Sequence, residues 1–322
     1  MNTILFSAPY MIPSLPRFRP ILEGYGLALI VPEVHERLSE AEILAYAGQF
    51  DGTICGDDHY TPRVLAACAP RLKIISKWGT GIDSIDRQAA AALGIRIGNT
   101  PNAFTLPVAD SVLGYMLAFA RRHPWMDRAV KAGIWDKLPG RSLSECTLGV
   151  IGVGTIGKAV VRRARAFGMT ILGNDIIEID HVFIKETGIE MTGLEDLLRR
   201  ADFVSLNCDL NPTSHHLMNA HTLASMRPTG VLINTARGPI VDEAALVAAL
   251  QAGQIAGAAL DVYEHEPLPA TSPLCQMDNV MLAPHNANSS PAAWERVHFN
   301  TLKNLLEGLG LPTVGLVATY NR

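Results

Sequence analysis

The chain is short of cysteine, of net charge and of long apolar stretches, and each shortage excludes a class of protein. Its five cysteines are scattered without a C-x-x-C pair, which argues against a zinc site or a disulfide framework and is typical of a reducing cytoplasm. The net charge of −4 comes with neither a basic block for nucleic acid nor a long acidic tail. The longest apolar run, about 108–120, contains Asp110 and is shorter than the roughly 20 residues that span a bilayer. Since the N-terminal segment also lacks the features of a secretory signal, we expect a soluble cytoplasmic protein without metal, nucleic-acid or membrane partners.

What the chain does contain is enough apolar sequence for two domains. It has 322 residues, of which 48% are hydrophobic and 18% charged. In the first hundred residues, short apolar runs alternate with amphipathic pieces such as 39–49 and 61–68. The runs predict strands at 3–6, 27–31, 52–55, 72–76 and 95–98. This alternation is typical of an α/β domain with a parallel sheet, and residues 99–102, rich in asparagine and proline, predict a turn or hinge.

A helix predicted at 106–121 leads into a second alternating unit. Its strands are predicted at 147–152, 170–174, 203–207, 231–234, 257–260 and 280–283. The helices between them are predicted at 156–167, 194–200, 219–226 and 243–252. A last helix, about 291–309, has an apolar face formed by Trp294, Val297, Leu302 and Leu305. The fold class is therefore α/β, with two parallel sheets.

A glycine motif follows the first strand of the second unit. Gly152, Gly154 and Gly157 form G-x-G-x-x-G between a strand and a helix, which is the context that a dinucleotide site requires. The first glycine permits the tight turn, the second lets the backbone approach a pyrophosphate, and the third lets helix and strand pack closely. The N-terminus of the helix offers N–H groups to the phosphates.

Asp175 ends the next strand, about 20 residues further on, where a carboxylate accepts hydrogen bonds from the ribose hydroxyls. Residues 173–180 contain no arginine or lysine that would receive a 2′-phosphate. We therefore predict NAD rather than NADP. A glycine-rich structural turn with a solvated aspartate is the plainer alternative.

Polar side chains follow three later strands, at the sheet edge where ligands bind in open α/β sheets. Arg237 follows a buried strand, and its planar guanidinium suits an α-carboxylate next to a carbonyl. Asp261 follows the next strand and is predicted to accept from the nicotinamide amide; Glu266 lies a few residues further on. His285 directly follows the last strand. Reduction of a ketone by hydride leaves an alkoxide that needs a proton, which histidine supplies near neutral pH, and Glu266 is the candidate to hold its ring.

Each of these side chains also has a structural interpretation. Arg237 alone is compatible with an ordinary salt bridge, and His285 alone is as compatible with a structural role as with a catalytic one. The remaining histidines of this unit are interpreted as surface or structural groups; they include His215, His216, His221 and His265. All three candidates follow strands of one nucleotide-binding unit, which favours a chemical role for them.

Several motifs together carry a resemblance to a known family. They are Lys77-Trp78-Gly79-Thr80-Gly81-Ile82-Asp83, Asn99-Thr100-Pro101-Asn102, Val108-Ala109-Asp110, the glycine motif, Asn234-Thr235-Ala236-Arg237-Gly238, Leu260-Asp261-Val262-Tyr263, Glu266-Pro267 and Pro284-His285. Over nearly the whole chain, the sequence resembles the D-isomer-specific 2-hydroxyacid dehydrogenases, in particular their phosphoglycerate dehydrogenase-like branch.

The resemblance implies both an architecture and a set of roles. Residues 1–99 and 289–322 would form a discontinuous substrate-binding domain, and the NAD-binding domain, 100–288, would be inserted into it, with hinges that let a cleft close. The catalytic residues would be Arg237 on the substrate carboxylate, His285 as acid/base and Glu266 as its partner. The cofactor-binding residues would be Gly152, Gly154, Thr155, Ile156, Gly157, Asp175, Cys208, Asp209, Thr213, Thr235, Ala236 and Asp261. The substrate-binding residues would be Lys77, Trp78, Gly79, Thr80, Asn102 and Arg237. A homodimer built through the cofactor domain is usual in the family.

The sequence leaves the substrate open. Asp57 and Asp58 stand where phosphoglycerate enzymes have a phosphate-holding arginine, and two acids there would repel a phosphate. Arg17 and Arg19, in the first loop, are candidates to compensate, or else they solvate a proline-rich turn. Lys77 is interpreted equally as a ligand for an anion or as a solvated lysine. Glycerate or hydroxypyruvate, glyoxylate, lactate and 3-phosphoglycerate all stay possible substrates at this point.

Two functions outside this reaction also stay open. One is an NAD-sensing binding protein of the corepressor type, because fold alone does not fix chemistry. The other is oxidation of a small anion such as formate or phosphite, although the formate branch replaces the residue at Glu266.

Overall fold

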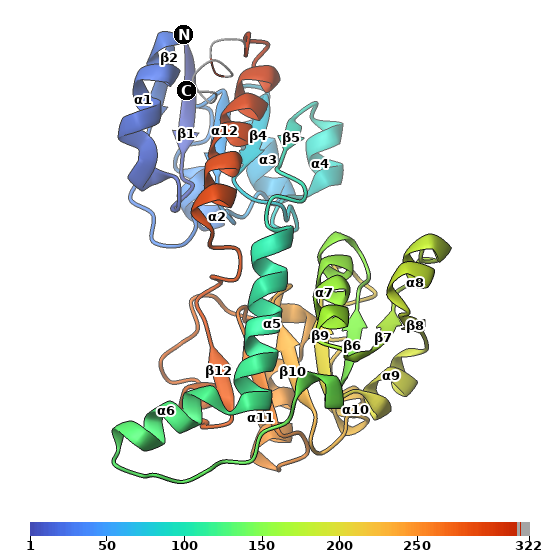
Figure 1. Cartoon of the computed structure of the whole chain (residues 1–322). Coiled ribbons are helices and arrows are strands. Elements are labelled where there is room, and N and C mark those ends of the chain that lie inside the picture. The colour runs from blue at the N-terminus through green and yellow to red at the C-terminus, as the bar shows by residue number, and fades with distance from the viewer. Residues whose placement is uncertain (314–315, 317–322) are drawn as a thin grey trace. The chain divides into compact units, whose positions relative to one another are not determined.

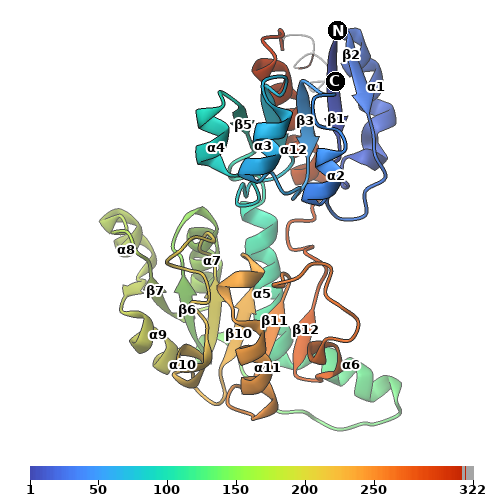
Figure 2. The same cartoon turned by 180° about the vertical axis from the view of Figure 1, so that it is seen from behind.

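The computed structural model describes residues 1–313 and 316, which fall into two compact units. The first unit combines Met1–Ala103 with the chain from Ser290 on, and the second is Phe104–Ser289. Each unit contains one sheet, and every strand pair in both sheets is parallel (Figures 1 and 2). The fold class expected from the sequence is confirmed: two doubly wound α/β domains, one inserted into the other.

The first unit has a five-stranded sheet in the order β2-β1-β3-β4-β5. The strands are β1 (Asn2–Phe6), β2 (Leu27–Ile30), β3 (Gly52–Cys55), β4 (Ile74–Lys77) and β5 (Arg96–Gly98). Its helices are η1 (Ile12–Ser14), α1 (Leu15–Gly24), α2 (Glu40–Leu44), α3 (Pro62–Cys68), α4 (Arg87–Ala92) and α12 (Pro291–Gly308). This strand order is that of flavodoxin-like folds, in which ligands bind at the carboxyl ends of β1 and β3, where the order reverses.

Helix α12 returns from the end of the chain to complete this unit. Val297, Leu302 and Leu305 of the predicted apolar face are buried, whereas Trp294 is partly exposed. The helix packs on β3, β4 and β5, and Ser76 on β4 donates a 2.7 Å hydrogen bond to the carbonyl of Thr301. The sheet therefore depends on a helix that is remote in sequence.

One segment of the first unit differs from the sequence-based expectation. Arg17 and Arg19 were expected in a loop, but they lie on helix α1. Pro16 occupies the first turn, where a missing N–H costs nothing, and Pro20 lies inside this ten-residue helix. Phe18 and Leu22 on its inner face are fully buried. Burial of this face outweighs the low helix propensity of the two prolines, so tertiary packing decides the local structure.

The second unit has a seven-stranded sheet in the order β12-β11-β10-β9-β6-β7-β8. The strands are β6 (Thr147–Ile151), β7 (Thr170–Asn174), β8 (Glu190–Met191), β9 (Phe203–Leu206), β10 (Val231–Asn234), β11 (Gly257–Leu260) and β12 (Val280–Leu282). The order reverses between β6 and β9, as in Rossmann folds, so the dinucleotide site is expected at their carboxyl ends.

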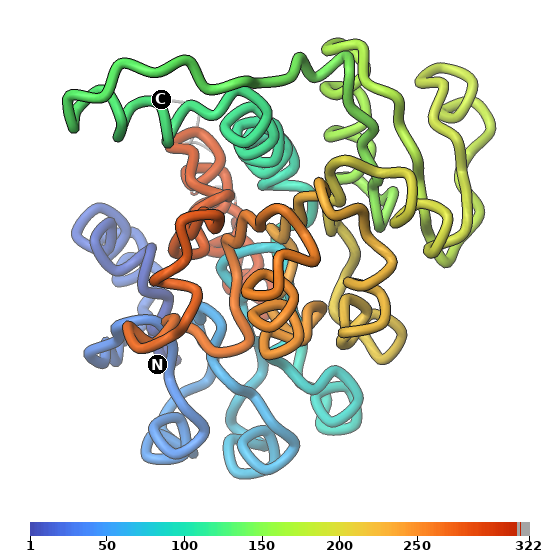
Figure 3. Tube along the Cα trace, turned by 90° about the horizontal axis from the view of Figure 1, so that it is seen from below, coloured from blue at the N-terminus to red at the C-terminus, as the bar shows by residue number. Residues whose placement is uncertain are grey.

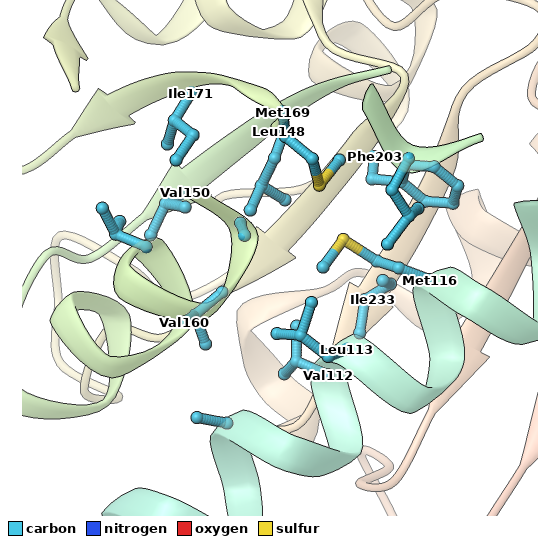
Figure 4. Close-up of a cluster of buried hydrophobic side chains, with 14 of the residues drawn as sticks. Val112, Leu113, Met116, Leu148, Val150, Val160, Met169, Ile171, Phe203 and Ile233 are labelled. Atoms are coloured by element: carbon cyan, nitrogen blue, oxygen red, sulfur yellow. The ribbon is translucent and has the colours of Figure 1, made fainter. Parts of the chain in front are cut away.

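Helices cover both faces of this sheet. They are α5 (Thr105–Arg121), α6 (His123–Lys131), η2 (Leu143–Glu145), α7 (Thr155–Ala166), α8 (His181–Thr187), α9 (Leu194–Arg200), α10 (Ala220–Ala224), η3 (Gly238–Ile240), α11 (Glu243–Gln251) and η4 (Pro273–Gln276). Helix α5 covers the face seen in Figure 1, and α10 and α11 cover the face seen in Figure 2. Figure 4 shows the core beneath α5 and α7, where Val112 and Met116 meet Leu148, Val150 and Ile233 of the sheet.

Helix α6 and the loop after it extend away from the sheet of the second unit (Figures 1 and 3). This segment carries exposed apolar side chains, which are Val130, Ile134, Trp135 and Leu138. Among the described residues, no helix has both the length and the apolar character needed to cross a membrane.

Candidate active site

The glycine turn between β6 and α7 has the geometry that a pyrophosphate needs. Gly152 has a φ of 86°, and a Cβ there would lie 2.5 Å from the backbone nitrogen of Cys208. A Cβ at Gly157 would lie 2.1 Å from the carbonyl oxygen of Gly152, so helix and turn pack too closely for any side chain. At Gly154, the N-cap of α7, a Cβ would meet nothing within 4 Å. The backbone at Gly154, Thr155 and Ile156 is thus accessible at the start of a twelve-residue helix, where N–H groups and the helix dipole favour an anion.

Asp175 lies directly beside this turn, at the end of β7. Its Oδ2 accepts a 2.6 Å hydrogen bond from the N–H of Val153, and its Oδ1 accepts one of 3.2 Å from the N–H of Ile177. The carboxylate is partly exposed. It is therefore held in a fixed orientation with surface left for the ribose hydroxyls.

Two buried polar atoms at the ends of β9 and β10 have no hydrogen-bond partner within the described chain. They are Oδ1 of Asn207 and Oγ1 of Thr235. Since buried polar groups are normally hydrogen-bonded, such atoms at a ligand-binding edge point to a ligand that satisfies them. The glycine turn, the oriented carboxylate and these two atoms fit a bound dinucleotide.

The other predicted cofactor residues lie in the loops that follow β9 and β10. Cys208 is partly exposed, and burial raises the pKa of its thiol to about 11, so it stays protonated at neutral pH. Asp209 and Thr213 are exposed, and Thr213 donates to Oδ1 of Asn211 within the same loop. Ala236 follows Thr235 and donates its N–H to Oδ1 of Asn234.

Asp261 has a structural role that the sequence did not predict. It was expected to accept from a nicotinamide amide, yet it is buried, with 1% of its surface exposed. Its two oxygens accept the N–H groups of Asn286 at 2.7 Å and Ala287 at 2.9 Å. Burial raises the pKa of this carboxyl, and the two backbone hydrogen bonds oppose the rise. Asp261 thus fixes the loop that follows His285, and contact with the cofactor stays a prediction.

Glu266 and His285 are adjacent in space. Nδ1 of His285 lies 2.9 Å from Oε2 of Glu266, and Oε1 of Glu266 accepts a 3.0 Å hydrogen bond from the N–H of Tyr263. Both side chains are partly buried: that of His285 is 22% exposed and that of Glu266 is 16% exposed. A carboxylate at this distance fixes the imidazole orientation and favours its protonated form. The acid/base role predicted for His285 is therefore compatible with this geometry and stays a prediction.

Arg237 lies on the loop after β10, and its Nη1 donates a 2.8 Å hydrogen bond to the carbonyl of Ala236. The next residue, Gly238, packs against the backbone of the following loop, since a Cβ there would lie 1.8 Å from the carbonyl oxygen of Tyr263. The loops that carry Arg237 and Glu266 are therefore in direct contact, which brings two of the three predicted catalytic residues to one part of the sheet edge.

In the first unit, the predicted substrate loop follows β4. Lys77 was interpreted either as a ligand for an anion or as a solvated lysine, and it is neither exposed nor unpaired: its Nζ lies 3.0 Å from Oδ1 of Asp57 and donates to the carbonyl of Trp78 at 3.2 Å. The lysine side chain is 5% exposed, whereas that of Asp57 is 33% exposed. Within this ion pair, the ammonium group is buried and the carboxylate is partly exposed.

The rest of this loop is held by local contacts. Gly79 has a φ of 128° and its carbonyl accepts the N–H of Thr100 at 2.8 Å, while Oγ1 of Thr80 donates to the carbonyl of Thr100 at 2.9 Å. Asn102 is exposed and has a left-handed φ of 62°. Trp78, predicted to bind the substrate, is buried, and its Nε1 donates to Nδ1 of His298 on α12 at 2.9 Å.

The two arginines proposed to compensate for a missing phosphate ligand have other partners. Arg17 forms an ion pair with Glu295 and lies over the rings of Phe18 and Phe299. Nη1 of Arg19 lies 3.5 Å from Oε1 of Glu23 on the same helix.

The sequence matches the family model described as D-isomer specific 2-hydroxyacid dehydrogenase, NAD binding domain, over residues 113–287. The chain belongs to this family. Its match to a glyoxylate reductase from Korarchaeum cryptofilum is 41% identical over 244 residues, which are 74% of this chain and 73% of that protein. The match to a D-3-phosphoglycerate dehydrogenase from Methanocaldococcus jannaschii is 39% identical over 81% of this chain but covers 50% of that protein.

A solved structure gives the same assignment. D-lactate dehydrogenase from Aquifex aeolicus, complexed with NAD and lactic acid, is 28% identical and superposes with a TM-score of 0.85 over 96% of this chain and 98% of that one. This dehydrogenase is therefore an NAD-dependent oxidoreductase that transfers a hydride between nicotinamide and C2 of a D-2-hydroxy or 2-oxo acid.

Sequence reasoning missed two kinds of site residue in this dehydrogenase. Ile176 and Ile177 directly follow Asp175 and are 79% and 64% exposed, which gives the carboxylate predicted to bind the ribose an apolar neighbour. Apolar residues directly after the predicted acid were a visible signal for this surface. Asn207 gave no such signal, because its unpaired oxygen is a property of the packing.

Proposed function

We propose that this dehydrogenase reduces a small, unphosphorylated 2-oxo acid, such as glyoxylate or hydroxypyruvate, to the 2-hydroxy acid. The observation that carries the proposal is the ion pair between Lys77 and Asp57. A phosphate ester brings up to two further negative charges, and these require cations with donors directed at the oxygens. Here the ammonium group of Lys77 already faces a carboxylate, and the exposed member of the pair is the acid.

The surroundings of the pair support the same substrate class. Asp58, next to Asp57, is completely buried and adds a second carboxyl beside the pair. Arg17 and Arg19, which were candidates to oppose these acids, are engaged with Glu295 and Glu23. Two carboxyls that share the charge of Lys77 disfavour a phosphate through both repulsion and desolvation.

The reaction that these residues support is a proton-coupled reduction. Arg237 binds the α-carboxylate of the substrate through its guanidinium group and orients the carbonyl. His285, held through Nδ1 by Glu266, donates the proton from Nε2 to the carbonyl oxygen. NADH, when bound, supplies the hydride that C2 accepts. Neutral His285 then regains a proton from solvent, and the reverse direction uses the same groups with His285 as the base.

The other residues predicted from the sequence would bind the cofactor and the substrate. Gly152, Gly154, Thr155, Ile156 and Gly157 would bind the pyrophosphate, and Asp175 the ribose, with Ile176 and Ile177 along the adenine. Thr235 and Asn207 would offer their unpaired oxygens to the cofactor, near the predicted contacts of Cys208, Asp209, Thr213, Ala236 and Asp261. In the first unit, the backbone of the loop with Trp78, Gly79 and Thr80, together with Asn102, would bind the substrate.

We also propose an oligomeric state and a cellular location. A homodimer built through the second unit would bury the apolar side chains at the projecting segment, which are Val130, Ile134, Trp135 and Leu138. A cytoplasmic location is supported by the scattered cysteines, all of which are unpaired in the structure.

The first experiment is consumption of NADH by the purified enzyme with glyoxylate, hydroxypyruvate and phosphohydroxypyruvate, repeated with NADPH. We expect kcat/KM for the two unphosphorylated acids to exceed that for phosphohydroxypyruvate by at least about tenfold. Asp57→Asn should narrow this ratio, because Lys77 would then be available to a negative group of the substrate. Asp127→Asn, in the exposed ion pair with Lys131 on α6, should leave the ratio unchanged. Preference for the phosphorylated acid by the unmodified enzyme would overturn the proposal. Tight NADH binding without turnover of any 2-oxo acid would instead favour a sensor protein.

A further inference from the structure

The loop between β11 and Glu266 contains a residue, Tyr263, whose backbone and side chain together contact the segments of all three predicted catalytic residues. Tyr263 is 7% exposed, and its backbone N–H donates the 3.0 Å hydrogen bond to Oε1 of Glu266. Its carbonyl lies against Gly238, the residue after Arg237. Its hydroxyl reaches the end of β12, two residues before His285.

The contacts of this hydroxyl are specific. It donates to the carbonyl of Ala283 at 2.9 Å, with the carbonyl of Leu260 at 3.1 Å as an alternative acceptor, and it accepts the N–H of Ala283 at 3.1 Å. Burial raises the pKa of Tyr263, so the phenol stays neutral and keeps its proton. The side chain thus forms a bridge between the loop that carries Glu266 and the strand end that carries His285.

The backbone at His285 is strained, so its conformation depends on contacts such as this bridge. His285 has a φ of 50°, a conformation that a residue with a side chain holds only when its surroundings fix it. Its N–H donates to the carbonyl of Asp261 at 2.8 Å, which fixes the segment on its C-terminal side together with the Asp261 carboxylate. On the N-terminal side, Ala283 is fixed by the β-ladder and by Tyr263.

We propose that Tyr263 is a positioning residue that sets the contact between Glu266 and His285, and thereby the protonation of His285 at working pH. The inference rests on the acid/base roles proposed above for these two residues but not on the identity of the substrate. Among the described residues, the carboxylates that face His285 include Glu266 at 2.9 Å and Asp261, whose pKa the charge of His285 lowers. Asp261 is fixed by backbone N–H groups, so Glu266 is the partner whose distance depends on Tyr263.

The test is Tyr263→Phe, which keeps the ring and removes the hydroxyl. We expect kcat/KM for glyoxylate reduction at pH 7.5 to fall about three- to tenfold, the size of one hydrogen bond. The alkaline midpoint of the pH profile, where the proton donor is lost, should move down by about half a pH unit, and the Kd for NADH should not change. Tyr60→Phe is the matched control, because Tyr60 is fully buried in the first unit and donates one hydrogen bond to Thr53 at 3.1 Å.

A double-mutant comparison separates positioning from stability. In a Glu266→Gln background, Tyr263→Phe should cause no further shift of the alkaline midpoint, because the contact through which it acts is already weakened. An equal shift in both backgrounds would overturn the proposal. So would a lowered melting temperature with an unchanged pH profile, as expected of Tyr60→Phe.

A second readout does not depend on turnover. The imidazole of His285 can be titrated by NMR in the NAD-bound enzyme and in Tyr263→Phe, with the signal assigned by its loss in His285→Ala. A lower midpoint in Tyr263→Phe supports the proposal even if no 2-oxo acid is reduced, and an unchanged midpoint refutes it. Absence of turnover in the unmodified enzyme would refute the proposed function alone.

Discussion

Nδ1 of His285 lies 2.9 Å from Oε2 of Glu266, although the two residues follow different strands of the sheet. The contact is possible because β11 and β12 are parallel neighbours, so the segments after them leave the same sheet edge. It fixes the orientation of the imidazole and places a carboxylate where it stabilises a positive charge on the ring. Four predictions follow from this site and from the charges of the first unit.

His285→Ala should lower kcat for the 2-oxo acid by about a hundredfold or more, because the alkoxide loses its proton donor. Binding of NADH, measured by fluorescence, should be retained, since the glycine turn and Asp175 are untouched. His181→Ala, at a residue whose side chain is 87% exposed on α8, serves as the control and should keep full activity. Full activity of His285→Ala would remove the acid/base assignment.

Arg237→Lys should raise the KM for the 2-oxo acid by about tenfold or more and lower kcat as well. Lysine keeps the charge but not the planar pair of donors that fits a carboxylate. Steady-state kinetics against substrate concentration measures both effects. Arg199→Lys, in an exposed pair on α9, should be neutral; equal kinetics of the two variants would argue against carboxylate binding by Arg237.

Asp175→Asn should reduce the preference for NADH over NADPH by about tenfold or more. The neutral amide no longer repels a 2′-phosphate, and it is a poorer acceptor for the ribose hydroxyls. The ratio of kcat/KM for the two cofactors is the measurement. An unchanged ratio would mean that selectivity is set elsewhere, for example by the apolar surface of Ile176 and Ile177.

Asp58→Asn should change the pH dependence of stability. Burial raises the pKa of Asp58 from 3.8 to about 6, so between these values the folded protein holds a proton that the unfolded chain releases. The free energy of unfolding therefore falls as pH rises through this window, by at most about 3 kcal/mol from this one group. The variant should lose that slope, because an amide can still accept the N–H of Leu38 and pair with Ser7 without ionising.

Urea unfolding at pH 4.5 and pH 7 measures this difference. The variant should gain stability relative to the unmodified protein at the higher pH. Asp86→Asn, at the N-cap of α4, is a suitable control because its carboxylate is partly exposed and caps a helix. Parallel pH curves for Asp58→Asn and the unmodified protein would show that Asp58 does not titrate in this range.

Much of the site was predictable because parallel sheets order their ends. Once the strands were identified from apolar runs, Arg237, Glu266 and His285 were expected at one sheet edge. The structure places Glu266 beside His285 and the loop of Arg237 against Tyr263, and their catalytic roles stay predictions. Helix α1 was not predicted because two prolines suggested a turn, whereas burial of Phe18 and Leu22 decides in favour of the helix.

Side-chain partners were the part that the sequence did not predict. Lys77 had two interpretations, as a ligand for an anion or as a solvated lysine, and neither included the observed ion pair with Asp57, which depends on the register in which Cys55 lies opposite Lys77. Asp261 was assigned to the cofactor from its position, but its oxygens are used by the loop after His285. Both outcomes depend on distances between strands rather than on residue type or spacing.

The return of α12 to the first unit has a consequence for biosynthesis. The strands of that unit are complete by Gly98, yet the helix that covers β3, β4 and β5 starts at Pro291. As the chain leaves the ribosome, the second unit has all its residues before the first one does. The early strands are therefore synthesised an entire domain before Leu302 and Leu305, which cover them, and during that interval their apolar surface is open to chaperones and to aggregation.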